Sequence, residues 1–493
     1  MTGKSILAGF LSLGNWGQRP PSARRSDIHT LWMQQAQLPS FVKETPAAMR
    51  TLDLLGPLAW GGFSERNLVR NWGQATVPFA ASAAAYLIKL NENLVSMGHL
   101  RQYFVEHPSF IWLCGFPLVP SASARHGFDA EASLPTPRHL TRMLREMPNA
   151  ALQYLLADSV RLIISELRAL GVEAGDCISL DTKHIIAWVK ENNPKAYVSD
   201  RYDKTKQPKG DRDCRLGCKR RRNRKEAQAG DRPAPATPKR NPVPVKGRSI
   251  GEYYWGYGSG VVVTKVPTWG EFVVAELTQP FDKPDVSYFF PLMTQVEQRL
   301  GHKPRCGAFD AGFDAWYVYD YFYRPDDPTA FAAVPFSEKG GYKAKGRQFD
   351  PSGLPLCAAG LAMPRQFDYH DRTISIIEHE RGKYVCPLVY PEPTGQTCPI
   401  QHKNWAKKGC TAAMPTSIGA RLRYTLDRES QAYKDIYKQR TAVERINSQA
   451  VALGIERPHI RNGQAIANLN TLIYLLINLR VLQRIRQRCA APD

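Results

Sequence analysis

Between residues 176 and 335 the sequence alternates short apolar runs, which are typical of strands, with longer amphipathic runs, which are typical of helices. Three strand patterns come first, and a short turn of Pro, Thr, Trp and Gly joins the second and third as in a hairpin. Helix and strand patterns then alternate twice. The strands are expected at 177–181, 258–266, 272–277, 305–310 and 330–335, and the helices at 286–300 and 315–323. An antiparallel meander followed by βαβ crossovers predicts a mixed α/β fold, with a five-stranded sheet and helices on its faces.

The N-terminal third of the chain has helical patterns. Residues 81–94 are rich in helix formers, and residues 150–170 carry apolar side chains at helical spacing. Thr136 and Pro137 are typical N-cap and first-turn residues of a basic amphipathic helix. That helix is either a DNA-contacting helix or a solvated surface helix. We expect a helical N-terminal domain over residues 1–170.

The α/β core is expected to be discontinuous in sequence. Residues 171–336 supply its first part, and two helical stretches at 427–453 and 465–488 complete it within residues 423–493. The last stretch is apolar on one side and rich in arginine on the other, which is typical of a helix that packs on a core and has a solvated basic edge.

A strongly basic insertion interrupts the first part of the core at residues 199–248. It contains 17 Lys and Arg against 6 Asp and Glu, together with five prolines between Pro233 and Pro244. High charge and few apolar residues predict disorder. We expect a DNA-phosphate-binding arm, and the alternative is a solvated linker. Its candidate contact residues are Lys219, Arg220, Arg221 and Arg222.

A second insertion, residues 337–422, is rich in Gly, Pro and Cys and should form a small β-rich module with one clear strand at 373–378. It contains four cysteines, which could close a structural zinc site or could be ordinary buried thiols. The gaps between them are long and contain no Cys-x2-Cys knuckle, so spacing alone favours the thiols. The four are Cys357, Cys386, Cys398 and Cys410.

The net charge of +21 indicates a polyanionic partner. A membrane surface is the other candidate, but no stretch reaches the roughly 18 apolar residues that a span needs. The most apolar segment, residues 469–482, is broken by two asparagines and an arginine. The ten cysteines are too scattered for a disulfide framework, which indicates a reducing, cytoplasmic compartment.

Three acidic residues stand at positions that suit phosphoryl transfer with two metal ions. Asp181 ends the first expected strand, and Asp310 ends the fourth. Glu444 lies in the helical stretch that follows the second insertion, as the last residue of Tyr437-x2-Arg440-x3-Glu444. Such a reaction needs several carboxylates that converge on two divalent cations. Each acid also has a structural alternative: a turn cap for Asp181, an Asx-turn for Asp310 with its neighbour Asp314 as the rival acid, and an ion pair with Arg440 for Glu444.

The chain here resembles the insertion-sequence DDE transposases, whose signature is Y-x2-R-x3-E-x6-K and whose second acid sits in a D-x-G-[FY] motif. The resemblance covers about residues 45–485. It implies an RNase H-like core, with Asp181, Asp310 and Glu444 as catalytic residues that bind Mg²⁺, or Mn²⁺ in its place. It also implies that Tyr437 and Arg440 contact DNA, that the helical N-terminal domain recognises element ends, and that the enzyme acts as a homodimer on double-stranded DNA, associated with the nucleoid.

One position departs from the signature, because Val451 stands where the family has its lysine. In the family this lysine is thought to grip a DNA phosphate near the cut. Arg445 lies about 100° round the helix from Glu444 and is a poor substitute. The expected function is cleavage at terminal inverted repeats and joining of the 3′-hydroxyl to target DNA. The alternatives are an inactive or domesticated transposase-derived DNA-binding protein, and an RNase H-like nuclease or resolvase without strand transfer.

Overall fold

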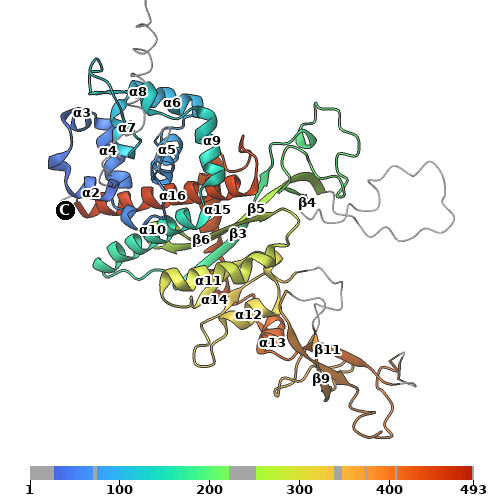
Figure 1. Ribbon diagram of the computed structural model, residues 1–493. Helices are drawn as coiled ribbons and strands as arrows, with labels where there is room; N and C mark the ends of the chain where they lie inside the picture. Colours follow the sequence, from blue (N-terminus) through green and yellow to red (C-terminus); the bar gives the residue numbers. More distant parts are fainter. Residues whose placement is uncertain are drawn as a thin grey trace, which may run out of the picture.

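Six strands form one mixed sheet in the part of the chain that the structure, a computed structural model, describes: residues 27–69, 75–220, 251–337, 347–371, 376–402, 404–405 and 408–490. Helices cover both faces of this sheet, and a separate three-stranded module projects from one end of the molecule (Figure 1). The mixed α/β class that the sequence predicts is therefore confirmed.

The sheet begins with an antiparallel meander. β3 (Cys177–Ile186) pairs antiparallel with β5 (Gly251–Val266), which pairs antiparallel with β6 (Gly270–Pro280). β7 (Cys306–Phe309) is parallel to β3, and β8 (Ala332–Ala333) is parallel to β7. The order β6-β5-β3-β7-β8 is the meander with two crossovers that the sequence predicts. β3 is longer than predicted, so Asp181 lies in the middle of the strand and not at its end.

Both faces of the sheet are buried. The crossover helices α11 (Phe289–Leu300) and α12 (Trp316–Phe322) share an apolar cluster with Val262 of β5. Val261 and Val263 belong to the cluster on the other face. Because successive side chains of a strand point to opposite faces, β5 needs an apolar residue at every one of these positions.

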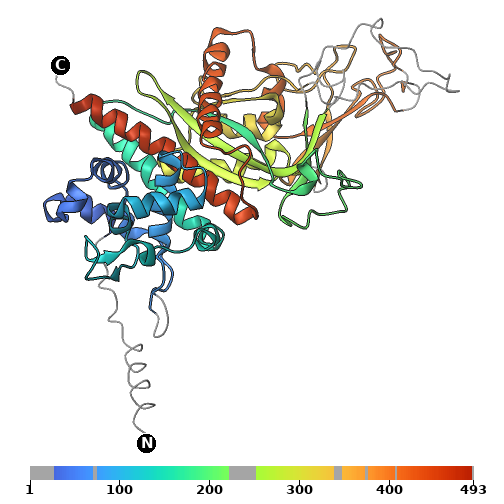
Figure 2. The same cartoon turned by 90° about the horizontal axis from the view of Figure 1, so that it is seen from above.

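The second face packs on α10 (Asn149–Ala169), α15 (Arg440–Ala452) and α16 (Gly463–Ala490). Figure 2 shows α16 between the N-terminal helices and the sheet, with α10 alongside it. The buried side-chain amide of Asn478 on α16 makes hydrogen bonds with the backbone N–H and C=O of Val273 on β6, each 2.8 Å long. These bonds fix α16 to the sheet in one register.

The described N-terminal part is helical, as predicted. Its longer helices pack into the same apolar cluster as α16. Thr136 caps α9 (Pro137–Glu146), since its hydroxyl accepts a hydrogen bond from the backbone N–H of His139. Two short strands, β1 (Val119–Pro120) and β2 (Phe128–Asp129), pair beside them. The helices that precede α10 are α2 (Ile28–Met33), α3 (Ser40–Lys43), α4 (Pro46–Leu55), α5 (Phe79–Asn91), α6 (Met97–Glu106), α7 (Pro108–Cys114), α8 (Ala130–Ser133) and α9 (Pro137–Glu146).

Among the described residues one helix, Gly463–Cys489, is long and apolar enough to cross a membrane. However, 83% of its most apolar window is buried inside the protein. Asn468 and Thr471 of this helix are also buried and hydrogen-bonded to other parts of the chain. This is the pattern of a helix packed inside a protein core.

The prediction of disorder over residues 199–248 is wrong for its first part. Residues 199–220 are folded against β5 and end in an additional strand, β4 (Arg215–Arg220). The buried thiol of Cys214 and the carboxylate of Asp211, which accepts a 2.7 Å hydrogen bond from the hydroxyl of Tyr257, anchor this segment. Residues 221–248 lie outside the described residues, and so do the candidate contacts Arg221 and Arg222.

The second insertion contains a three-stranded antiparallel sheet of β9 (Arg365–Asp371), β10 (His379–Val385) and β11 (Thr411–Pro415). The described part of the insertion is β-rich, as predicted, but residues 376–378 of the strand expected at 373–378 are not in a strand. Residues 376–378 are in the connection between β9 and β10, and residues 373–375 lie outside the described part. The chain then returns to the core through α13 (Ile418–Thr425) and α14 (Gln431–Tyr437).

Candidate active site

Asp181 and Asp310 come together through the parallel pairing of β3 and β7. Leu180 of β3 is opposite Phe309 of β7, and the two aspartates are the next residue on each strand. Asp310 ends the pairing and starts a tight turn, in which its carboxylate accepts a 2.8 Å hydrogen bond from the backbone N–H of Gly312. The two acids expected at this sheet edge are therefore neighbours in space.

Asp181 lies in a largely buried position, with its side chain 20% exposed. Burial raises the pKa of Asp181 to about 6, and the nearby carboxylates of Asp310 and Asp285 act in the same direction. The guanidinium of Arg440 and the backbone N–H of Thr182 oppose this rise. A carboxylate whose negative charge is poorly solvated, and lies beside other acids, is a good ligand for a cation.

Glu444 approaches the aspartates from α15, which packs on β3. One guanidinium joins the two sides: Nη1 of Arg440 is 2.7 Å from Oε1 of Glu444, and Nη2 is 4.0 Å from Oδ2 of Asp181. The ion pair that was the structural alternative for Glu444 thus exists. This ion pair lies next to the two aspartates, because Arg440 also faces Asp181.

Tyr437 and Arg440 do not share one continuous helix, contrary to the prediction for residues 427–453. Tyr437 ends α14, and Arg440 begins α15. The joint is tightened by i to i−3 hydrogen bonds, among them Thr441 N–H to Lys438 C=O at 3.2 Å. Burial raises the pKa of Tyr437, the charge of Arg440 opposes this rise, and the charges of Asp310, Glu444 and Asp181 add to it.

Two residues beside the acids, Asp285 and Asn447, were not predicted from the sequence. Asp285, before α11, accepts a 2.8 Å hydrogen bond from the hydroxyl of Thr182. A methyl group at Gly312 would lie 2.8 Å from Oδ1 of Asp310 and 2.9 Å from Oδ2 of Asp285, so both carboxylates border this glycine. Asn447 of α15, three residues after Glu444, contacts Asp181. Only the spacing of Asn447 on the face of α15 that carries Glu444 could have indicated it.

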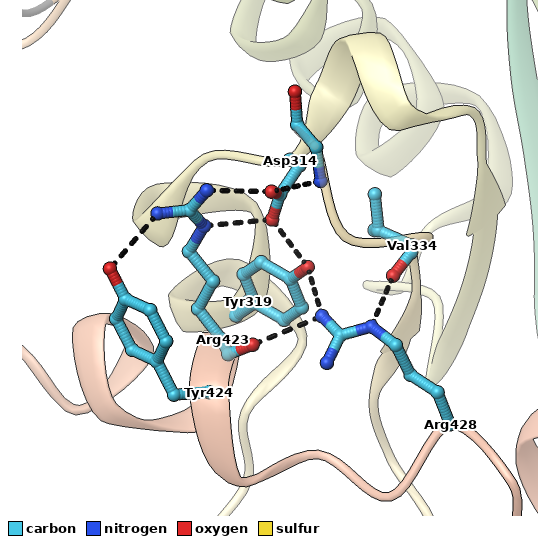
Figure 3. Close-up of polar contacts among 7 residues, drawn as sticks. Asp314, Tyr319, Val334, Arg423, Tyr424 and Arg428 are labelled. Carbon is cyan, nitrogen blue, oxygen red and sulfur yellow. Dashed lines mark hydrogen bonds and ion pairs between the residues drawn. The ribbon is translucent and has the colours of Figure 1, made fainter. Parts of the chain in front are cut away.

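Asp314, the rival of Asp310, has a different place. Its fully buried carboxylate forms a two-pronged ion pair with Arg423 of α13 and accepts a hydrogen bond from the hydroxyl of Tyr319 (Figure 3). Arg428 donates to the same tyrosine and to the carbonyl of Val334 (Figure 3). This network fastens the segment that returns from the module onto α12 and β8, and it makes Asp314 a structural residue.

Val451 stands where the transposase signature has lysine, so another basic side chain near α15 would have to bind the DNA phosphate. Val451 is 38% exposed, and Arg445 is held by Glu271 of β6 at 2.9 and 3.0 Å. Lys183 lies two residues after Asp181 on β3, so both side chains leave the same face of the strand. Its Nζ is 3.6 Å from Oε2 of Glu456. Lys183 is thus a basic residue on β3, the strand that carries Asp181.

The donor set suits Mg²⁺, which prefers carboxylate and amide oxygens. Within the described ranges, no three Asp, Glu, His or Cys side chains are already arranged to hold a metal ion. Arg440 stands between Asp181 and Glu444 and offsets their repulsion instead. The orphaned Oδ1 of Asn447 is buried without a hydrogen-bond partner among these residues, which is the kind of oxygen that a cation would satisfy.

The remaining candidates are apart from this site. Lys219 and Arg220 belong to β4, at the far end of β5 from the stretch that pairs with β6. The four cysteines belong to the module of β9, β10 and β11. A comparison with models of known protein families and with curated protein sequences finds no match to this chain.

Proposed function

We propose that the protein is a DNA transposase of the DDE type, which cleaves DNA at the terminal inverted repeats of a mobile element and joins the 3′-hydroxyl to target DNA. One observation carries this proposal. The pairing of β3 with β7 sets Asp181 beside Asp310, and α15 brings Glu444 to the same place through Arg440. Acidic groups from two neighbouring strands and one helix are what phosphoryl transfer with two metal ions requires.

The finer description of the fold that goes with this function is an RNase H-like core. The antiparallel meander of β3, β5 and β6, followed by the parallel strands β7 and β8, agrees with the core that the resemblance to insertion-sequence transposases implies. The module of β9 to β11 sits between β8 and α13, where that family often has an inserted domain. The helical N-terminal part would recognise the element ends.

Asp181, Asp310 and Glu444 are the residues that would hold Mg²⁺ or Mn²⁺, with Asp285 close enough to assist. The metal, when bound, supplies the positive charge that activates the attacking oxygen and stabilises the leaving oxygen. Asp181 has to be ionised to bind a cation, and a pKa of about 6 leaves it ionised above neutral pH. Arg440 would turn from the carboxylates to a DNA phosphate, which its planar guanidinium can bind with two hydrogen bonds.

The partner would be double-stranded DNA, both element ends and target, bound mainly through Lys and Arg contacts with phosphates. The net charge of +21 supports this choice of partner. A transposase that cuts two ends works as a dimer on DNA, and we expect a homodimer in the nucleoid of the cytoplasm. Lys219, Arg220, Arg221 and Arg222 would contribute to phosphate binding.

The test is cleavage and joining of a labelled duplex that carries the inverted repeat flanking the coding sequence, in the presence of Mg²⁺. Asp310→Asn should abolish cleavage while binding of the duplex persists, because affinity comes from basic groups elsewhere. Asp326→Asn, in the exposed loop after α12, is the matched control and should cleave as the wild type does. Wild-type cleavage by Asp310→Asn would remove Asp310 from the mechanism.

The same assay separates the alternatives. Cleavage without joining indicates an RNase H-like nuclease or resolvase. Binding without cleavage, in the wild-type protein, indicates an inactive or domesticated DNA-binding protein. Val451 in the place of the family lysine is the observation that favours this second alternative.

A further inference from the structure

The four cysteines of the second insertion gather at one end of its three-stranded sheet, although the sequence separates them widely. Val385 of β10 pairs with Thr411 of β11 in an antiparallel register. Cys386 and Cys410 are the next residues outward on the two chains, so they lie opposite each other. Side chains at such opposite positions have Cβ atoms about 4.5–5.5 Å apart. The chain is also close at Gly409, where an added Cβ would lie 2.5 Å from the Cβ of Cys386.

Cys357 reaches the same place from a hairpin that leads into β9. The preceding residue, Leu356, forms an antiparallel bridge with Ala362, and Gly360 closes the turn in a left-handed conformation with φ of 76°. Cys357 and Cys410 pack against the same small apolar cluster, that of Met363, Tyr384 and Met414. Cys410 thus lies between Cys357 on one side and Cys386 on the other.

Cys398 adds a fourth thiol. It is buried in one small cluster with Cys386 and Leu388, and Cys410 packs against that cluster. A turn follows Cys398, in which the backbone N–H of Gln401 donates to its carbonyl at 3.0 Å. Each of the four cysteines thus lies in or beside a tight turn, and all four are free thiols.

The module has little else to hold it together. Two small apolar clusters lie within its described residues, one of four buried residues and one of three, and two of the latter three are cysteines. Small loop-rich units with so little core need a disulfide or a structural metal for stability. A reducing compartment leaves the metal.

We propose that Cys357, Cys386, Cys398 and Cys410 bind one structural Zn²⁺ as four thiolates, which closes the end of the β9–β11 module. Zn–S bonds of about 2.3 Å in a tetrahedron place the sulfur atoms about 3.8 Å apart. In the described part of the chain the metal-free side chains do not yet form a closed ligand set. Zinc would draw the sulfurs together as it replaces their protons.

Zinc binds cysteine as the thiolate, so metal binding should release protons from the four thiols and weaken as the pH falls. None of this depends on the proposed transposase function.

The experiment is a metal analysis of the full-length protein purified under reducing conditions from cells supplied with zinc. Atomic emission should find one Zn²⁺ per chain, and a mercurial reagent that caps thiols should release it to a chromogenic chelator. Cys386→Ser and Cys398→Ser should each lose most of the metal. Cys489→Ser changes an exposed thiol on α16 and is the matched control, which should keep the full content.

A second measurement uses only the wild-type protein, so it tests the zinc site even if the cysteine variants fail to fold. The wild-type protein is stripped with a chelator and titrated with Co²⁺, which should give the visible bands of tetrahedral cobalt and a sulfur-to-metal charge-transfer band. Protein without zinc and without these bands would overturn the proposal and leave four ordinary buried thiols. Full zinc content in Cys398→Ser would overturn the four-thiolate site. Because DNA cleavage is not measured, failure here is distinct from failure of the proposed function.

Discussion

Nδ2 of Asn447 on α15 donates a hydrogen bond to Oδ2 of Asp181 on β3, across 3.3 Å. Asn447 follows Glu444 by three residues, so both side chains lie on the same face of the helix. One face of α15 thus carries the amide of Asn447, which contacts Asp181, and the carboxylate of Glu444, which pairs with Arg440. We infer that Asn447 positions Asp181 and keeps it ionised, since a hydrogen bond to the charged form lowers the pKa of a carboxyl group.

Asn447→Ala should raise the pKa of Asp181 further above its ordinary value, because it removes a hydrogen bond to the ionised carboxylate. The acid limb of the pH profile for DNA cleavage, measured at subsaturating Mg²⁺, should move to higher pH. Gln449→Ala truncates an exposed amide on the same helix and should leave the profile in place. An unchanged acid limb in Asn447→Ala would make the contact with Asp181 irrelevant to the reaction.

Asp181 should destabilise the protein at neutral pH. Its pKa is about 6 in the folded chain and 3.8 when exposed, so the folded state holds the proton more tightly. This contribution to stability is present below pH 3.8 and is lost as the pH rises to 6 and beyond. The ionised carboxylate then costs at most about 3 kcal/mol.

Asp181→Asn cannot titrate at this position. Its free energy of unfolding in urea, measured with a metal chelator present, should exceed that of the wild type by more at pH 7.5 than at pH 4.5. Asp326→Asn, which replaces an exposed aspartate, should show no such dependence on pH. An equal difference at both pH values would mean that the folded chain does not raise the pKa of Asp181.

The parts of this fold that sequence patterns predict are those with strong local periodicity. The run of valines in β5 and the turn before β6 identify a hairpin without any knowledge of its partners. The position of Asp310 follows in the same way, because a short apolar strand ends there. Which strands become neighbours is a tertiary property, and only chain order and handedness rules made the pairing of β3 with β7 a reasonable expectation.

The parts that were missed depend on a few long-range contacts. Composition averaged over residues 199–248 indicated disorder, but the buried Cys214, the hydrogen bond between Asp211 and Tyr257 and the pairing of β4 with β5 hold its first 22 residues on the core. Asp285 begins a short 3-10 helix, Asp285–Tyr288, that carries no motif, and only the fold brings it to Asp310. Sequence patterns also continue across the joint between Tyr437 and Arg440, because both flanking segments are helical.

Asp314→Asn should destabilise the segment of α13 and α14, which leads from the module back to the core, and should not abolish DNA cleavage. Removing one partner of a buried ion pair leaves Arg423 uncompensated, which costs about 3–5 kcal/mol. Urea unfolding should show this loss, and at low temperature the folded fraction should still cleave DNA. Asp326→Asn again serves as the control. Full stability with lost cleavage would exchange the roles assigned to Asp314 and Asp310.

The β4–β5 hairpin allows the basic segment to be removed without disturbing the fold. Arg220 and Gly251, which flank residues 221–250, are opposite each other in an antiparallel ladder, so an Asn-Gly turn can join them. This replacement removes nine Lys and Arg but only two Asp and Glu. Each phosphate contact that is lost lowers the slope of log affinity against log salt by about 0.9, so the loss of several contacts should lower it by roughly 3.

Fluorescence anisotropy with duplex DNA over a range of salt concentrations measures this slope, and a thermal melt shows that the fold is kept. A matched variant keeps the length of residues 221–250 and replaces their basic residues with Gln, which separates charge from length. Both variants should give the same reduced slope. A deletion that extends back to residue 199 should instead unfold the chain, because it removes Cys214 and the partner of Tyr257 from the core. An unchanged salt slope in the hairpin variant would make the segment a spacer, and phosphate binding would then rest on Lys183, Arg440 and the other basic groups of the folded chain.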